Sequence, residues 1–129
     1  DPIKNKDPMG LKMVKTSVTL YDNTDIPHCW LSCGSQTAGR YPIGGIFNSP
    51  SEIHSPDDHA GQQKQSEDIW LDDCDYDIGK FESCVKSKMI NHAPAGRYNV
   101  VFSMCYTWAF NVVDSCQEAA KKTRSKCCQ

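Results

Sequence analysis

The cysteine best placed for chemistry is Cys105, which follows an apolar run and opens a segment of helical periodicity. A cysteine at the start of a helix is a recurring form of reactive thiol, because the N-terminal amides of the helix stabilise the thiolate. Such a thiol also needs an imidazole within hydrogen-bonding distance as its base. Of the four histidines, only His28 falls in a predicted strand, which would hold it stiffly. We therefore interpret Cys105 and His28 as candidate nucleophile and base.

A second set of potential ligands lies in residues 48–66, a segment rich in Ser, Pro, Asp, His and Gln without periodicity. It offers two imidazoles and two carboxylates within six residues, from His54, Asp57, Asp58 and His59. Such a set could bind zinc or another divalent ion. We favour a long, solvated surface loop, because nothing rigid in the segment would fix the ligands. No metal or cofactor is therefore expected.

The eight cysteines in 129 residues indicate an oxidising compartment and a fold stabilised by disulfides. The chain begins with Asp1-Pro2 rather than Met, from which we expect that a signal peptide has been removed or that the chain has been trimmed, and we expect the protein to be secreted. If Cys105 is a free nucleophile, at least one other cysteine must also be unpaired or intermolecular. We interpret Cys29 and Cys33 as structural.

The charge distribution gives no electrostatic reason to expect nucleic acid as a partner, since 14 basic and 16 acidic residues are interspersed and sum to −2. No stretch approaches the roughly 18 consecutive apolar residues of a membrane span. We expect a soluble monomer.

The elements that must position these residues follow strand and helix patterns. Residues 1–12 contain two Asp-Pro junctions and little periodicity, which predicts a flexible arm before a single domain over 13–129. Short turns between the first three strands favour an antiparallel meander. Alternation of apolar and polar residues predicts strands over 14–20, 28–33, 40–47, 67–72 and 97–102.

Two helices complete the predicted fold. The first spans 78–89, with Asp75 or Asp77 as N-cap, and the second begins at Cys105. The apolar stripe of the second helix consists of Ala109, Val112, Val113 and Cys116. We therefore predict an α+β fold in which an antiparallel sheet of four or five strands packs against two helices, with Cys105 facing His28.

Two segments carry a family resemblance. The first comprises residues 20–32, including Pro27-His28-Cys29-Trp30, followed by residues 40–45, Arg40-Tyr41-Pro42-Ile43-Gly44-Gly45. The second is residues 96–109, in which a strand pattern leads into Met104-Cys105-Tyr106. They resemble the histidine-bearing start and the nucleophile region of circularly permuted papain-like hydrolases of the NlpC type. The resemblance covers roughly residues 14–120, and Met104 stands where the family commonly has asparagine.

Members of that family hydrolyse amide or related acyl bonds, often in peptidoglycan stem peptides, and several are exported antibacterial toxins. The resemblance implies a papain-like core and a cysteine amidase or peptidase acting on a peptide or cell-wall substrate, with Cys105 as nucleophile and His28 as base. A third polar residue orients the imidazole in the family, and the candidates here are Arg40, Tyr41 and His54. The alternative is a catalytically inactive secreted binding or effector protein whose eight cysteines form four disulfides.

Overall fold

The computed structural model describes residues 13–23, 28–99 and 105–124, with side chains from residue 18 onward. The predicted arm, residues 1–12, lies outside this part of the chain, as do Met104, Cys127 and Cys128. The described elements, in chain order, are β1 (Met13–Asn23), β2 (His28–Cys33), β3 (Gln36–Pro42), β4 (Ser49–His54), β5 (Gln65–Asp72), α1 (Ile78–Lys88), β6 (Pro94–Tyr98) and α2 (Cys105–Ala119).

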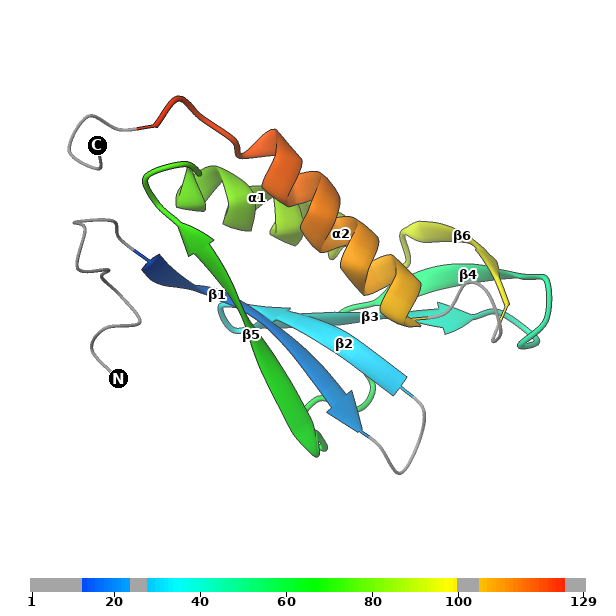
Figure 1. Ribbon diagram of the computed structural model, residues 1–129. Coiled ribbons are helices and arrows are strands. Elements are labelled where there is room, and N and C mark those ends of the chain that lie inside the picture. Colours follow the sequence, from blue (N-terminus) through cyan, green and yellow to red (C-terminus); the bar gives the residue numbers. More distant parts are fainter. Residues whose placement is uncertain (1–12, 24–27, 100–104, 125–129) are drawn as a thin grey trace.

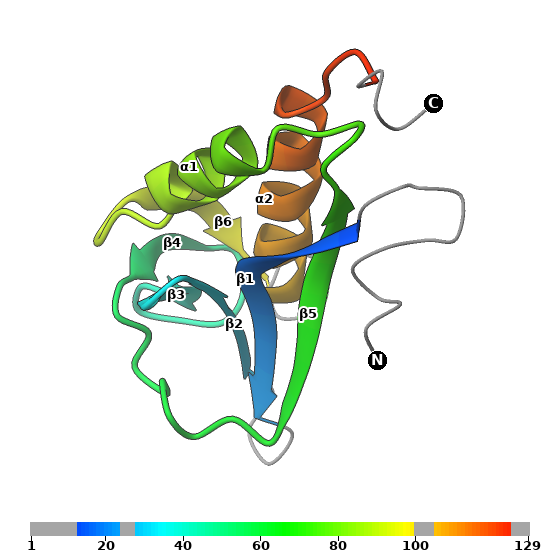
Figure 2. The ribbon, with the colours of Figure 1, turned by 90° about the vertical axis from the view of Figure 1, so that its left-hand side faces the viewer.

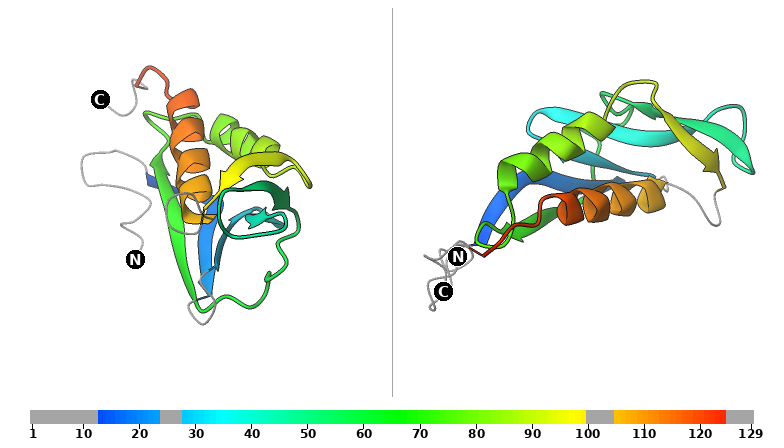
Figure 3. Two further views of the ribbon diagram at one scale, coloured as in Figure 1. Left: turned by 90° about the vertical axis from the view of Figure 1, so that its right-hand side faces the viewer. Right: turned by 90° about the horizontal axis from the view of Figure 1, so that it is seen from above.

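The strands form one sheet in the order β5-β1-β2-β3-β4-β6, and every neighbouring pair is antiparallel. The two helices lie side by side along the same face of this curved sheet (Figures 1 and 2). Seen from above, the helices run beside the sheet from the β1 end to the β4 and β6 end (Figure 3). The predicted α+β fold, antiparallel meander and two packed helices are therefore confirmed.

The predicted number of four or five strands is wrong, because the described residues contain six. The missed strand is β4, which lies inside the predicted loop 48–66. Its residues alternate between buried and less buried positions, but two of the buried ones are Ser49 and Ser51 rather than apolar residues. The strand period was therefore present without the hydrophobic signal that normally reveals it.

Two other predicted strands are displaced. The third strand spans Gln36–Pro42 rather than 40–47, because Gly34, with φ of 64°, allows the chain to reverse immediately after β2. The sixth strand begins at Pro94 rather than at residue 97, and residues 100–102 of the predicted strand lie outside the described part. The bounds of β2 agree with the prediction, and α2 begins at Cys105 as expected.

The hydrophobic core lies between the helices and the sheet face that carries Cys29, Leu31 and Cys33. All four residues of the predicted α2 stripe are buried in it. Asp77 caps α1 by accepting a 3.0 Å hydrogen bond from the Lys80 backbone N–H. Because side chains alternate along a strand, Trp30 and Ser32 point to the opposite face of β2, whereas His28, at the first position of the strand, also interacts with Cys105.

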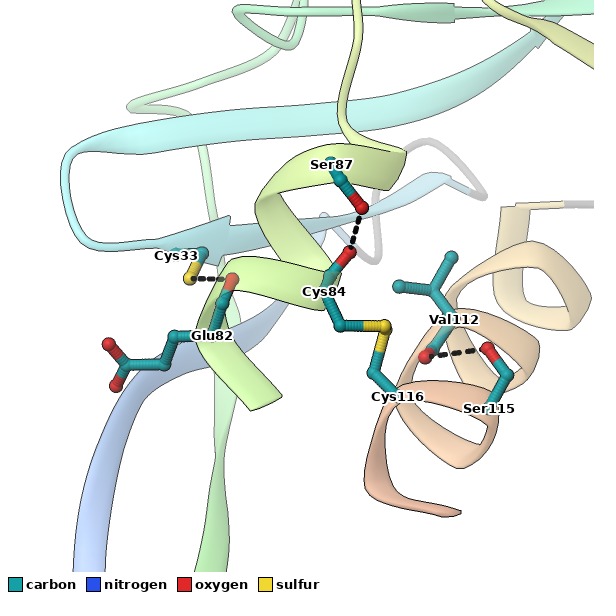
Figure 4. Close-up of a disulfide and its surroundings, with 7 residues drawn as sticks. All are labelled: Cys33, Glu82, Cys84, Ser87, Val112, Ser115 and Cys116. Carbon is teal, nitrogen blue, oxygen red and sulfur yellow. Dashed lines mark hydrogen bonds between the residues drawn. A yellow bond between two sulfur atoms is a disulfide. The ribbon is translucent and has the colours of Figure 1, made fainter. Parts of the chain in front are cut away.

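A disulfide between Cys84 and Cys116 joins α1 to α2 (Figure 4). Cys74 is also disulfide-bonded. By contrast, Cys33 keeps its thiol, which lies 3.8 Å from the Glu82 carbonyl oxygen and donates to it. The expectation of a disulfide-stapled fold is thus confirmed for the pair of helices. Within the described ranges, neither helix has the length and apolar character that a membrane crossing requires.

Candidate active site

Three side chains form a closed hydrogen-bonded triangle at the start of β2. His28 Nε2 lies 3.0 Å from Asp57 Oδ1 and 2.7 Å from the Tyr41 hydroxyl. The same hydroxyl donates to Asp57 Oδ1 over 2.9 Å, so its oxygen accepts from His28. This pattern assigns a proton to Nε2 and leaves Nδ1 for a different partner.

The local backbone brings these groups together. Asp57 follows β4, and its backbone N–H donates to Thr37 Oγ1 on β3 over 3.0 Å, which ties the loop to the sheet. Its side chain is 0% exposed, against 11% for that of His28. Gly39 on β3 makes room for the contact, because a Cβ there would collide with Asp57 Oδ1 and lie 3.2 Å from two atoms of the His28 ring.

The Cys105 thiol lies at the first residue of α2 and is fully buried. The pairing of β2 with β3 stops at Leu31 and Ala38. Beyond that point, the backbone N–H of Cys29 donates to Cys105 Sγ over 3.1 Å. The helix N-terminus and this amide both favour a negative charge on sulfur.

The electrostatics of the site favour a thiolate facing an imidazolium. Hydrogen bonding to Cys29 is the largest influence on Cys105 and, with the His28 imidazole, lowers the pKa of the thiol to about 5 against the effect of burial. Burial alone would lower the pKa of His28, but hydrogen bonds and charges from Asp57 and Cys105 raise it to about 9. Between these two values, both groups are charged.

Two further ionisable neighbours, Cys29 and Tyr41, stay neutral. The pKa of Cys29 is raised, first by its hydrogen bond to Cys105 and then by burial, so the negative charge resides on Cys105. Burial and the Asp57 carboxylate raise the pKa of Tyr41, which therefore remains a hydroxyl that can hydrogen-bond.

The three predicted orienting residues are placed differently. Tyr41 contacts His28 directly, and His54 stacks on Tyr41 with a centroid separation of 4.3 Å. Arg40 points elsewhere, since its Nε donates to Ser51 Oγ over 2.9 Å and its Nη2 donates to the Arg97 carbonyl. Arg40 and Tyr41 are adjacent on a strand, so only one of the two can share a face with His28.

Asp57 is the neighbour of His28 that sequence reasoning missed, having been weighed only as a metal ligand. Among the described residues, the four potential metal ligands of the 54–59 segment do not gather at one point. His54 lies 2.9 Å from Asp58 and 3.1 Å from Glu52, His59 Nδ1 lies 3.2 Å from Gln62, and Asp57 contacts His28. In the sequence, Asp57 is a carboxylate close to two histidines, and this pattern is common to metal sites and catalytic sites.

The distribution of thiols contradicts two expectations. Cys29 and Cys105 are both free, so the described residues do not fit a protein with all eight cysteines paired. Cys29, interpreted as structural, instead belongs to the site through its backbone N–H and its thiol. Cys29 directly follows His28 on β2. Its backbone N–H therefore lies close to the site, although the side chains of neighbouring strand residues point to opposite faces.

No protein-family model, curated protein or solved structure matches this chain significantly. The chemical capacity of the site therefore follows from its own geometry. A thiolate at a helix N-terminus, an imidazolium beside it and a buried carboxylate behind the ring are the groups that nucleophilic acyl transfer requires.

Proposed function

We propose that the protein is a secreted cysteine hydrolase of the papain-like, NlpC type that cleaves an amide bond in a peptide or cell-wall substrate. The observation that carries this proposal is the pairing of Cys105, whose pKa is lowered to about 5, with His28, whose pKa is raised to about 9. Cys105 is the nucleophile and His28 the general acid and base. Asp57 and Tyr41 together take the orienting role.

In this mechanism, Cys105 Sγ attacks the amide carbonyl carbon and forms a C–S bond. The negative charge moves to the carbonyl oxygen, where the first backbone N–H groups of α2, which have no intrahelical partner, can stabilise it. The Nδ1 proton of His28 then passes to the departing amine as the C–N bond breaks. Water, deprotonated by His28, releases the acid and restores the thiolate.

Asp57 and Tyr41 act on the ring rather than on the substrate. Their contacts with Nε2 fix the imidazole plane, and the negative charge of Asp57 stabilises the imidazolium. Without this support, His28 would lose both its orientation and part of its affinity for the proton.

Export is supported by the cysteine chemistry. The Cys84–Cys116 disulfide, together with that of Cys74, is typical of a protein that matures in an oxidising compartment. The resemblance to a family with exported antibacterial toxins makes peptidoglycan stem peptides the first substrates to examine.

One observation favours the alternative, a catalytically inactive secreted binding or effector protein. Cys105 is 0% exposed, so a substrate carbonyl reaches its sulfur only if neighbouring groups move. In that alternative, the polar groups around His28 serve stability alone.

The first test is the mass of the native protein before and after iodoacetamide without reductant, followed by peptide mapping. Cys29 is an internal control, because it is equally buried but has a raised pKa. We expect Cys105 to be alkylated first, at a rate that stays high down to its own pKa. Hydrolysis of peptides and peptidoglycan is then compared with a Cys105→Ala variant. If Cys105 is unreactive or is found in a disulfide, the hydrolase proposal fails and the inactive binding protein remains as the function.

A further inference from the structure

A cavity of about 580 Å³ lies between β6, the end of α1 and the first half of α2. Three cations line it, Arg40, Lys88 and Arg97, and none of the described residues in its wall is acidic. The whole chain carries a net charge of −2, so this concentration of positive charge departs from the average surface. The volume suits a ligand as large as a short peptide.

The cavity is close to the nucleophile. Thr107 and Trp108, which line it, are on the first turn of α2 together with Cys105. Burial lowers the pKa of Arg40 while the charge of Cys105 acts in the opposite direction, which puts the guanidinium within electrostatic range of the thiolate. Figure 1 shows β6 and the start of α2 at the same end of the molecule. Cys105 itself is buried and is not part of the cavity wall, so a ligand in the cavity would lie near the nucleophile without touching its sulfur.

The chemistry of the wall selects an anion. Lys88 and Arg97 are exposed, and within the described ranges no carboxylate forms an ion pair with either. The Arg97 guanidinium is held toward Asn48, whose side-chain oxygen accepts from Nε over 3.3 Å. Guanidinium and ammonium groups bind carboxylates with charge-assisted hydrogen bonds. The half-buried Trp108 adds a flat apolar surface for the rest of the ligand.

We propose that this cavity is a substrate subsite that binds an acidic peptide, with a carboxylate of the peptide placed between Lys88 and Arg97. This inference rests on the proposed function, because it names the class of substrate that Cys105 would cleave. It requires that binding depend on the charge of the peptide and on these two cations.

Binding is measured in the Cys105→Ala variant, so that no turnover interferes. The probes are blocked tripeptides that differ only in a central Glu, Gln or Lys, titrated by calorimetry and by tryptophan fluorescence. A charge-assisted hydrogen bond predicts that the Glu peptide binds about 10-fold more tightly than the Gln peptide. The preference should shrink with added salt and disappear in Arg97→Gln with Lys88→Gln. Lys80→Gln is the matched control, because Lys80 is also exposed on α1 but lies outside the cavity wall.

The outcomes separate this subsite from the proposed hydrolase. Equal binding of the Glu and Gln peptides, or a Glu preference that survives the double substitution, overturns the subsite even if the wild-type protein cleaves peptides. A preference that depends on both cations supports the subsite. If the wild-type protein then binds but never cleaves such peptides, the hydrolase proposal fails, while the cavity stands as a binding site for acidic peptides.

Discussion

His28 and His54 have similar partners but very different surroundings. Each imidazole has a carboxylate oxygen about 3 Å away, at 3.0 Å for His28 and 2.9 Å for His54, and Tyr41 lies between the two rings. The His28 side chain and its Asp57 partner are 11% and 0% exposed, whereas those of His54 and Asp58 are 26% and 53% exposed. Only His28 also reaches a thiol.

The difference shows that an acid beside an imidazole does not by itself make a general base. An exposed pair such as His54 with Asp58 is screened by water and contributes little. At His28, burial lowers the pKa of the imidazole, and the Asp57 and Cys105 interactions more than reverse that effect. The following substitutions test this contrast, in order of decreasing effect.

His28→Ala should reduce kcat/KM for peptide hydrolysis about 10³-fold, because it removes the general acid and base. It should also raise the pKa of Cys105, since His28 helps to hold the thiolate. Ultraviolet absorbance of the thiolate, titrated against pH, measures this second effect without any substrate. A Cys105 titration that does not move would show that His28 is not its partner.

Asp57→Asn should lower kcat by about 10²-fold and narrow the pH range of activity. In the wild-type protein, the thiolate and imidazolium coexist from about pH 5 to about pH 9. Loss of the carboxylate charge lowers the pKa of His28, so the alkaline limit should fall while the acid limit changes less. Asp58→Asn, which alters the exposed pair, is the matched control. Equal pH profiles for the two variants would contradict the assigned role of Asp57.

Gly39→Ala should lower activity about 10-fold and destabilise the fold by about 1 to 3 kcal/mol, as overpacking does. The added methyl group would collide with Asp57 Oδ1 and press against the His28 ring. Activity and urea unfolding are measured beside Gly45→Ala, where no atom lies within 4 Å of the added Cβ. Similar behaviour of the two variants would mean that the Asp57 contact is looser than described.

His54→Gln should change kcat/KM by no more than about 2-fold, because the exposed pair contributes little. Its stacking on Tyr41, which contacts His28, is its most direct link to that imidazole among the described contacts. The measurement is the same peptide assay, with the alkylation rate of Cys105 as a second readout. A loss close to that of His28→Ala would place His54 in the catalytic machinery.

The sequence predicted those parts of the site that are marked by local periodicity. β2 and the start of α2 have clear patterns, and they carry His28 and Cys105. Asp57 is 29 residues from His28, and no spacing rule relates a loop carboxylate to a strand imidazole. β4 was not predicted because serines occupy two of its buried positions. The role of the Cys29 amide was not predicted because every residue except proline has a backbone donor, whatever its side chain.

The burial of Cys105 also bears on how the protein matures. In an unfolded chain its thiol has an ordinary pKa, because the lowering comes from Cys29 and His28 in the folded state. The contacts that activate the sulfur and the packing that shields it from solvent are thus both properties of the folded protein. Cys105 is a weak nucleophile wherever the chain is unfolded and a buried one wherever it is folded.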